Sequence, residues 1–278
     1  MPFYLYKGFK DVVLADEAEH AKIYENPTEN TYECLTNEYL IVRDSDGNIL
    51  DKFKWTGSVC KPLFYKAFNS EAVGKIKPRN VHQELAFDML IDKSSTVKML
   101  LGGYGSGKTL CMVAAALSAI KAGQFERIIW CRNNIETKGS RPIGHLPGSA
   151  NDKLLPFALP LADHLGGIDG LNYAINRGTI ELQHLGFIRG RDIRNSIIMC
   201  SEAENLSKEN VQLLLGRVGE GSNLWLDGDL KQVDAAEFVH SSGLAAAIDK
   251  LAGNPLFGYV HLEKTERSPT AALADLLD

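Results

Sequence analysis

The sequence has no apolar stretch that approaches the roughly 20 residues of a membrane-spanning helix. Its first residues lack the basic segment and the long apolar segment of a secretory signal peptide. Internal repeats and low-complexity tracts are also missing, which excludes repeat arrays and fibrous proteins. From these absences we expect a cytoplasmic protein that has no membrane partner.

Cysteine pairs with metal-ligand spacing are missing as well. The five cysteines are scattered, and none stands in a C-x-x-C or Cys/His arrangement, so reduced thiols are the simplest interpretation. An excess of basic residues is also lacking, since the formal net charge is −5. The chain as a whole therefore has no attraction to nucleic acid, and any such binding would need a local basic patch.

Residues 102–109 read G-G-Y-G-S-G-K-T and fit the P-loop pattern G-x-x-x-x-G-K-[ST]. An apolar run at residues 97–101 precedes the loop and a helical apolar pattern follows it, which is the strand–loop–helix setting that the motif needs. Backbone N–H groups and the helix N-terminus would hold phosphate, Lys108 would neutralise the β- and γ-phosphates, and the Thr109 hydroxyl would bind Mg²⁺. An ordinary glycine-rich turn is the alternative interpretation. The predicted contacts to ATP come from Gly102, Gly103, Tyr104, Gly105, Ser106, Gly107, Lys108, Thr109 and Leu110.

The rest of the chain after the P-loop alternates between strand and helix patterns. Helical patterns are predicted at residues 82–91, 110–120, 152–165 and 208–215 and at the C-terminus. Strands are predicted at residues 97–101, 127–131, 179–183, 196–200, 223–226 and 258–262. This alternation predicts an α/β fold with a mainly parallel sheet covered by helices on both faces.

Residues 1–75 differ in character and predict a small β-rich module ahead of a nucleotide-binding domain at residues 76–278. Two β-rich runs, 39–43 and 49–55, flank an Asp-Gly turn and predict a hairpin. Asp44 and Asp46 superficially resemble part of a calcium loop, but no glutamate follows at the required position. Turn chemistry therefore explains these aspartates better, and the module contains no catalytic constellation.

An acidic segment follows the strand predicted at residues 196–200. Glu202 is placed to polarise the water that attacks the γ-phosphate. The aspartate that usually precedes such a glutamate is replaced by Ser201, whose hydroxyl can hold a Mg²⁺-bound water but brings no charge. Mg²⁺ affinity or turnover would then be weakened. The alternative is that the acidic residues only cap the next helix.

The next predicted strand ends in G-D-x-x-Q, formed by Gly228, Asp229 and Gln232. Ligands of an open α/β sheet bind at the carboxyl ends of the strands, so Asp229 and Gln232 are expected to face the γ-phosphate. Asp229 would complete the Mg²⁺ shell, and Gln232 would position water or sense the phosphate.

Together these motifs resemble the PhoH-like ATPases, a P-loop family whose core is similar to the first RecA-like domain of superfamily 1 helicases. The resemblance runs from about residue 76 to the C-terminus. The segment S-E-A-E-N at residues 201–205 stands where the family has D-E-A-Q-N, so its first and fourth residues depart from the family pattern. The resemblance implies that Gln83 reads the adenine base, as a helicase glutamine does. The other matching elements are the entry segment 77–83, the G-x-L-P-G…K…P loop at 144–156, R-G-R at 189–191 and R-V-G-x-G-S at 217–222.

Two arginines are candidates for stabilising the charge that phosphoryl transfer develops. Arg217 is expected late in the helix that follows the Glu202 strand, a position that in ring-forming P-loop ATPases often points at the nucleotide of the neighbouring subunit. We therefore predict that Arg217 acts in trans. Arg267 resembles the helicase arginine that reaches the γ-phosphate of its own chain. For both, a solvated or structural arginine is the alternative. The resemblance also implies a homo-oligomer in the form of a hexameric ring.

A local basic group surrounds the R-G-R element. Arg189, Arg191 and Arg194, with Lys138 and Arg141, would suit the phosphates of single-stranded RNA, a subunit interface or ordinary surface charge. No RNP-type aromatic pattern supports base stacking.

Two functions follow from these observations. The first is Mg²⁺-dependent ATP hydrolysis, coupled to oligomer rearrangement and to RNA binding or unwinding. The second is a nucleotide-binding regulatory or scaffold protein in which Ser201 makes hydrolysis slow or absent. The presence of Glu202, Asp229 and Gln232 favours the first. A small-molecule kinase would need an acceptor-binding lid; we identify none, but the Gly- and Pro-rich loop at residues 139–148 leaves this alternative open. Only one RecA-like domain fits in this length, so unwinding would require adjacent subunits.

Overall fold

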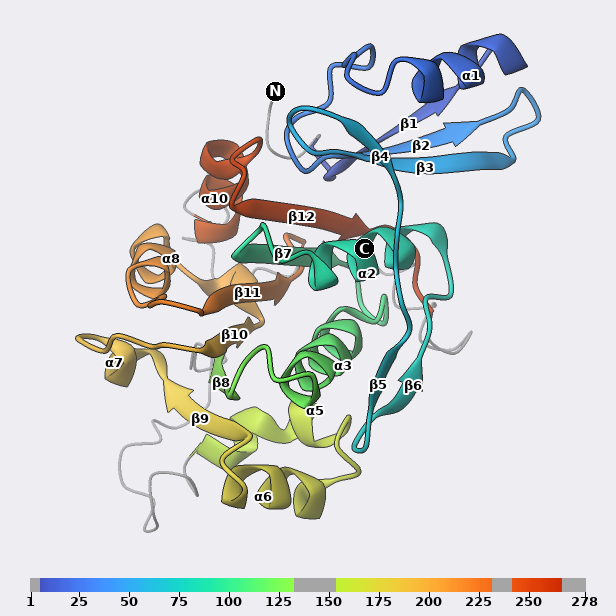
Figure 1. The fold of residues 1–278 in the computed structure, drawn as a ribbon. Helices are drawn as coiled ribbons and strands as arrows, with labels where there is room; N and C mark the ends of the chain where they lie inside the picture. The colour runs from blue at the N-terminus through green and yellow to red at the C-terminus, as the bar shows by residue number, and fades with distance from the viewer. Residues whose placement is uncertain (1–5, 133–153, 232–241, 267–278) are drawn as a thin grey trace.

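The computed structural model describes residues 6–132, 154–231 and 242–266. Its centre is a parallel sheet with the strand order β12-β7-β11-β10-β8-β9 (Figure 1). Each neighbouring pair in it is parallel, which confirms the predicted α/β fold with a mainly parallel sheet. The strands are β7 (Val97–Gly102), β8 (Arg127–Arg132), β9 (Ile180–His184), β10 (Ser196–Ser201), β11 (Asn223–Gly228) and β12 (Phe257–Leu262).

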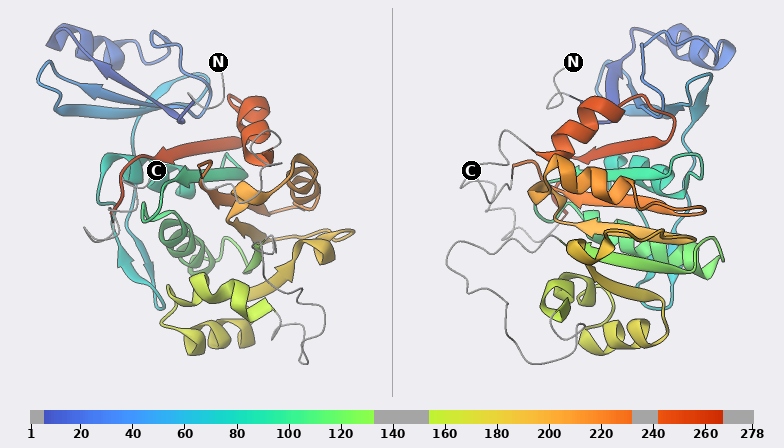
Figure 2. Two further views of the ribbon diagram at one scale, coloured as in Figure 1. Left: turned by 180° about the vertical axis from the view of Figure 1, so that it is seen from behind. Right: turned by 90° about the vertical axis from the view of Figure 1, so that its left-hand side faces the viewer.

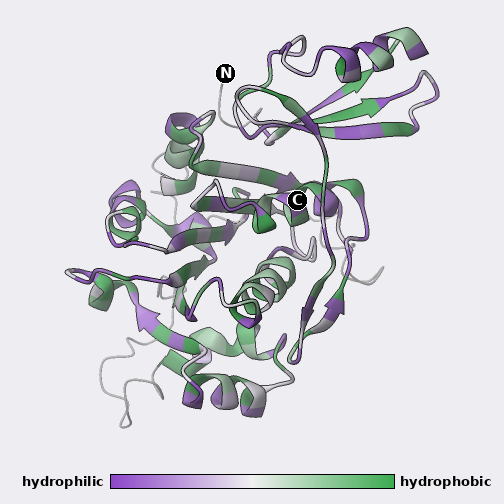
Figure 3. Cartoon of the chain, viewed as in Figure 1, coloured by the Kyte–Doolittle hydropathy of each residue, from purple (hydrophilic) through white to green (hydrophobic). Residues whose placement is uncertain are grey.

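Helices cover both faces of this sheet (Figure 2). One core cluster joins α2 (Val81–Ile91) and α3 (Lys108–Lys121) to alternate strand residues such as Met199 and Trp225. A second cluster joins α8 (Lys208–Leu215) and α10 (Gly243–Leu251) to the intervening residues, including Cys200 and Leu226. Because successive side chains of a strand point to opposite faces, and helices cover both faces, the central strands must be apolar on both sides. Figure 3 shows the resulting concentration of hydrophobic residues in the central strands and α3.

The helix predicted at residues 152–165 is divided in the structure. Residues Leu155–Ala158 form a 3-10 turn, and α5 covers only Leu159–Ala162. Each piece has a proline, Pro156 or Pro160, as its second residue, where the missing N–H is tolerated, whereas within a continuing helix proline has no N–H to donate. The prediction of one continuous helix was therefore wrong. The sequence analysis did not predict α1 (Glu17–Glu25), α6 (Ile168–Asn176), α7 (Leu185–Ile188), the 3-10 turn Ala203–Asn205 or α10.

The N-terminal module is a small sheet with the strand order β1-β2-β3-β4. Its predicted hairpin is confirmed, since β2 and β3 pair antiparallel over the predicted residues. The Asp44 carboxylate accepts hydrogen bonds from the backbone N–H groups of Asp46 and Asn48, which is the turn chemistry expected. The strands are β1 (Phe9–Val13), β2 (Tyr39–Arg43), β3 (Ile49–Trp55) and β4 (Cys60–Pro62), and the separate ribbon is β5 (Phe68–Ser70) with β6 (Gly74–Ile76).

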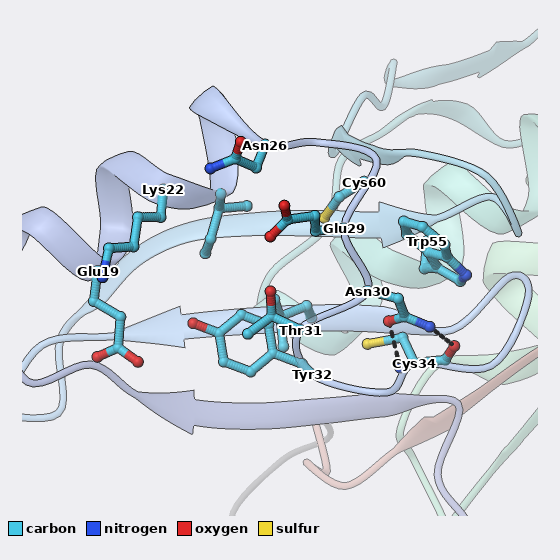
Figure 4. Close-up of a pocket in the computed structure, with 12 residues that line it drawn as sticks. Glu19, Lys22, Asn26, Glu29, Asn30, Thr31, Tyr32, Cys34, Trp55 and Cys60 are labelled. Atoms are coloured by element: carbon cyan, nitrogen blue, oxygen red, sulfur yellow. Dashed lines mark hydrogen bonds between the residues drawn. The ribbon is translucent and has the colours of Figure 1, made fainter.

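A hollow of about 220 Å³ lies in this module between α1, the loop that follows it and the small sheet (Figure 4). Its walls include Tyr32, Cys34 and Trp55. None of the lining residues belongs to the P-loop, so this hollow is separate from the nucleotide site predicted above. All five cysteines are free thiols, as predicted. Among the described residues, none of the helices has the length and apolar character that crossing a bilayer requires.

Partly buried polar contacts dock the module onto α2. The Tyr39 hydroxyl donates to Asp88 at 2.8 Å, and the Lys54 ammonium donates to Asp92 at 2.5 Å. Burial alone would raise the pKa of Asp92, but the hydrogen bond and charge of Lys54, together with hydrogen bonds from Ser94, outweigh it and lower that pKa to about 2. The Asn37 amide also donates to the backbone carbonyl of Phe257, the first residue of β12. The module is thus fixed to the P-loop domain through α2 and β12.

Lys54→Met tests this docking. It leaves two partly buried carboxylates, Asp88 and Asp92, without their ion-pair partner, so we expect a loss of about 2 kcal/mol in the free energy of unfolding. Urea denaturation near pH 7 measures it. The control is Lys93→Met, an exposed lysine beside Asp92, which should change stability by less than about 0.5 kcal/mol. Equal effects from the two variants would contradict the docking role.

Candidate nucleotide site

The P-loop connects the carboxyl end of β7 to α3, as predicted. Gly102 has φ +154° and Gly107 has φ +88°, backbone angles that residues with a side chain rarely adopt. A Cβ on Gly102 would lie 2.4 Å from the carbonyl oxygen of Leu262, so the space there also requires glycine. The loop is therefore held against the end of β12 by close backbone packing.

Lys108 and Thr109 begin α3 and lie at the carboxyl edge of the sheet. The Lys108 ammonium donates to the carbonyl oxygens of Gly102 at 2.6 Å and of Gly103 at 2.9 Å. The Thr109 hydroxyl donates to the Asp227 carboxylate at 2.6 Å. Of the other predicted P-loop contacts, Ser106 is buried, Tyr104 is exposed, and Gly103, Gly105 and Leu110 are half-buried.

Asp227 is the residue that the sequence analysis missed. It lies near the end of β11 and is only 1% exposed. One carboxylate oxygen accepts the Thr109 hydroxyl, and the other accepts the backbone N–H of Glu202 at 3.1 Å. A charged residue at the end of the apolar run 224–226 was the available signal, but the neighbouring G-D-x-x-Q motif drew the assignment to Asp229.

Ser201 and Glu202 follow at the end of β10. Ser201 is buried. The Thr109 hydroxyl has a single proton to donate, and it donates that proton to the Asp227 carboxylate and not to Ser201. Glu202 has φ +53°, a left-handed conformation that costs a residue with a side chain of the order of 1 kcal/mol. Its carboxylate is paired with the Arg132 guanidinium from the end of β8. The end of β10 is therefore a strained corner held from two neighbouring strands.

Asp229 and Glu204 are buried next to this corner. The Asp229 N–H donates to the Glu204 carboxyl at 3.2 Å, and the Asp229 carboxylate accepts the N–H of Lys231. Burial, together with the charges of Asp227 and Glu202, raises the pKa of Glu204 to about 7. Hydroxyl and carboxylate oxygens are the ligands that Mg²⁺ prefers, and Thr109, Asp227 and Asp229 supply them at one edge.

A magnesium ion would not be caged by protein alone. Within the described residues no group of three or more His, Cys, Asp or Glu side chains is arranged to hold a metal ion. Magnesium usually takes one or two protein ligands and completes its shell with phosphate oxygens and water. The donor set at this edge fits that mode of binding.

Gln83 and the chain after β12 border the P-loop. The Gln83 amide donates to the carbonyl oxygen of Ser106 at 3.0 Å and accepts the N–H of Arg79 at 2.9 Å. Gln83 therefore lies beside the loop with its amide bonded to protein, and its role in reading adenine stays a prediction. Beyond β12, the Glu266 N–H donates to the Gly105 carbonyl and the Thr265 hydroxyl donates to the Tyr104 carbonyl. Arg267 and Gln232 themselves lie outside the described residues.

Arg217 lies away from the P-loop of its own chain. Its carbonyl oxygen accepts the N–H of Ile193, and its side chain donates to the carbonyl oxygen of Arg191. These contacts are at the residues that lead into the amino ends of β10 and β11, whereas the P-loop lies at the carboxyl ends. Arg191 and Arg194 are paired with Glu181 and Asp192, which reduces the predicted basic patch. Lys138 and Arg141 lie outside the described residues.

Comparison with known proteins identifies relatives of this chain. The profile of the PhoH-like protein family matches residues 75–274. The protein PhoH2 of Bacillus subtilis (strain 168) is 32% identical over 295 residues, an alignment that covers 98% of this chain and 64% of that protein. Protein PhoH2 of Mycolicibacterium smegmatis is 34% identical over 201 residues, covering 71% of this chain and 46% of that protein. A PhoH-like protein of Bacillus subtilis is 33% identical over 177 residues, which is 62% of this chain and 54% of that protein.

The chain thus spans about half to two-thirds of the length of these relatives. The alignment with the Bacillus PhoH2 covers 98% of the chain and therefore takes in the N-terminal module as well as the P-loop domain.

Glu204→Gln tests the buried acid. Folding raises the pKa of Glu204 from 4.5 to about 7, so the folded state keeps a proton that the unfolded state has lost between these pH values. This contribution to stability is present below the unfolded pKa and is lost as the pH rises through about 7. Glutamine mimics the neutral acid, so the variant should be about 3 kcal/mol more stable than wild type near pH 8 and equal to it near pH 4. Thermal unfolding across this range measures the difference.

The matched control is Glu220→Gln, which changes an exposed glutamate on the loop before β11. Its stability should follow that of wild type at every pH. If the Glu204→Gln curve runs parallel to the wild-type curve, Glu204 does not titrate as the buried geometry requires.

Proposed function

The chain belongs to the PhoH-like protein family, and from this premise we propose that it binds ATP with Mg²⁺ and hydrolyses it. The observation that carries the proposal is the P-loop itself: Lys108 and Thr109 begin α3 beside a buried carboxylate, and Glu202 follows on a neighbouring strand. An ordinary glycine-rich turn would not explain this convergence of acidic residues at the carboxyl ends of β10 and β11.

In this proposal the P-loop N–H groups and Lys108 hold the phosphates of ATP. The Lys108 ammonium now donates to carbonyl oxygens of the loop, which keeps it beside the space that the phosphates would fill. Thr109, Ser201 and Asp229 are the side chains proposed to face the Mg²⁺ shell. When bound, the metal neutralises charge that develops on the β- and γ-phosphates.

Glu202 is the residue proposed to orient the attacking water. Its carboxylate is half-exposed and held by Arg132, so it is fixed in direction while remaining accessible. Gln232 and Arg267 are proposed to position water and to stabilise the γ-phosphate. For Arg267, the support is that the chain just before it, at Glu266, is hydrogen-bonded to the P-loop carbonyl of Gly105.

A ring of identical subunits is the assembly that we propose, with Arg217 reaching the nucleotide of a neighbour. The location of Arg217 at the amino ends of β10 and β11 supports action between subunits, because it separates this arginine from the P-loop of its own chain. Single-stranded RNA is the proposed partner of the ring. The exposed Arg189 of the R-G-R element is available for a phosphate contact.

The second candidate function is a nucleotide-gated regulatory or scaffold protein that hydrolyses ATP slowly or not at all. The observation that favours it is the neutral Ser201 at the position where the family pattern has aspartate. A site without that charge would bind the nucleotide and change conformation with little turnover.

Lys108→Ala tests the proposed hydrolysis. Removing the ammonium takes away the charge that faces the transferred phosphoryl group, so phosphate release from Mg²⁺-ATP should fall at least about 100-fold. The exposed Lys121 at the other end of α3 gives the control Lys121→Ala, which should retain wild-type turnover. Adding single-stranded RNA to the wild type tests the coupling, and stimulation is expected. Wild type that binds ATP without releasing phosphate would support the scaffold function instead.

Arg217→Ala tests the action in trans. We expect turnover to fall about 1000-fold, because a transferring phosphoryl group loses its arginine. Mixing Arg217→Ala with Lys108→Ala should then recover activity, since each subunit supplies what its neighbour lacks. Light scattering with nucleotide present measures the assembly, and Arg177→Ala, an exposed arginine after α6, serves as the control. No recovery in mixed oligomers would contradict the proposal.

A further inference from the structure

The neighbouring strands β10 and β11 place Ser201 and Asp227 side by side. Cys200 pairs with Leu226 in the parallel register, so Ser201 and Asp227 are the next positions along the two strands. Met199 and Trp225, two residues earlier, both pack in the cluster under α3. Because strand side chains alternate, Ser201 and Asp227 point to that same face, where α3 begins with Lys108 and Thr109.

The Asp227 carboxylate is buried and has no cation partner among the described residues. Its two oxygens accept the Thr109 hydroxyl and the Glu202 N–H, and none of the ion pairs formed by the described lysines, arginines and histidines includes it. The Arg132 guanidinium, at the end of the neighbouring strand β8, is paired with the Glu202 carboxylate. These two donors stabilise the Asp227 carboxylate, but its charge has no countercharge in the described part of the chain, and a bound cation would supply one.

We propose that the carboxylate that the family pattern places at position 201 has been transferred in this chain to Asp227 on the adjacent strand. Ser201 is small and uncharged, and Asp227 supplies from β11 the charge that Ser201 lacks. This inference rests on the proposed function, and it deepens that function by naming the carboxylate on the Mg²⁺ side of the site.

Asp227 also links the metal side of the site to the side that orients water. Its second oxygen holds the N–H of Glu202, whose left-handed backbone turns the chain away from β10. One carboxylate therefore contacts the Thr109 hydroxyl and fixes the residue that carries the proposed base. A neutral residue at position 227 would lose the charge and weaken both contacts.

The test compares Asp227→Asn, Ser201→Asp and the exchanged double variant Ser201→Asp/Asp227→Ser in the full-length chain. The readout is Mn²⁺ affinity in the presence of ADP, measured by electron paramagnetic resonance, with ADP affinity in EDTA and thermal unfolding recorded in parallel. We expect Asp227→Asn to weaken Mn²⁺ binding by about tenfold or more while ADP affinity in EDTA stays unchanged. The exchanged double variant should regain affinity to within about threefold of wild type.

Two outcomes would overturn the transfer. One is wild-type Mn²⁺ affinity in Asp227→Asn. The other is a folded double variant that binds Mn²⁺ as weakly as Asp227→Asn, which would make Asp227 only a structural support for Glu202. Asp249→Asn, an exposed acid on α10, should leave Mn²⁺ affinity unchanged. If Asp227→Asn fails to fold, the Mn²⁺ affinity of the double variant relative to wild type still tests whether the carboxylate has been transferred.

The proposed function and this inference can fail separately. The transfer is supported if wild type binds Mn²⁺ and ADP, Asp227→Asn binds Mn²⁺ weakly, and the double variant regains Mn²⁺ affinity. This holds even if wild type releases no phosphate from ATP. If wild type hydrolyses ATP but Asp227→Asn binds Mn²⁺ as tightly as wild type does, the proposed function stands and the transfer is overturned.

Discussion

A carboxylate buried at the edge of a sheet stays in place only where donors or cations surround it, and Asp227 has two donors. The Thr109 hydroxyl comes from the first turn of α3, and the Glu202 N–H comes from the end of β10. Through these two bonds, β11 connects the P-loop to the acidic corner. The alignment of Thr109 and the orientation of Glu202 therefore depend on one side chain that belongs to neither motif.

The parallel topology makes this connection possible. Because β11 lies between β7 and β10 and all three run in the same direction, their carboxyl ends meet at one edge. The interior of each strand is buried on both faces and must be apolar, so polar chemistry is confined to the last residues. The N-terminal module is connected to the P-loop through α2. It bonds to Asp88 of α2 and to Asp92, the C-cap of that helix, and Gln83 of the same helix bonds to the P-loop carbonyl of Ser106.

Local pattern predicted the parts of this structure that local forces determine. The central strands, α2, α3 and the hairpin of β2 and β3 were all indicated by apolar periodicity and turn residues. The helix at residues 152–165 was wrong because two prolines restart the backbone there. Asp227 was missed for a different reason. Its partners Thr109 and Glu202 are distant in sequence, so its role exists only once the strand order is known. Family patterns assign the acid to position 201, and a transfer between strands leaves no motif to match.

Three locally unfavourable features coincide at the ends of β10 and β11. Glu202 has a left-handed backbone, the burial of Glu204 raises its pKa to about 7, and Asp227 is a buried acid with no cation from the described residues. Each lowers the stability of the folded chain: glycine would relieve the backbone strain at position 202, and neutral side chains would remove the cost of burying an acid at positions 204 and 227. Strain and perturbed titration collect where a protein binds or reacts, because there stability is exchanged for a pre-organised site. The coincidence of all three within one corner, next to a P-loop, therefore argues that this edge is kept for a cationic ligand and not for folding.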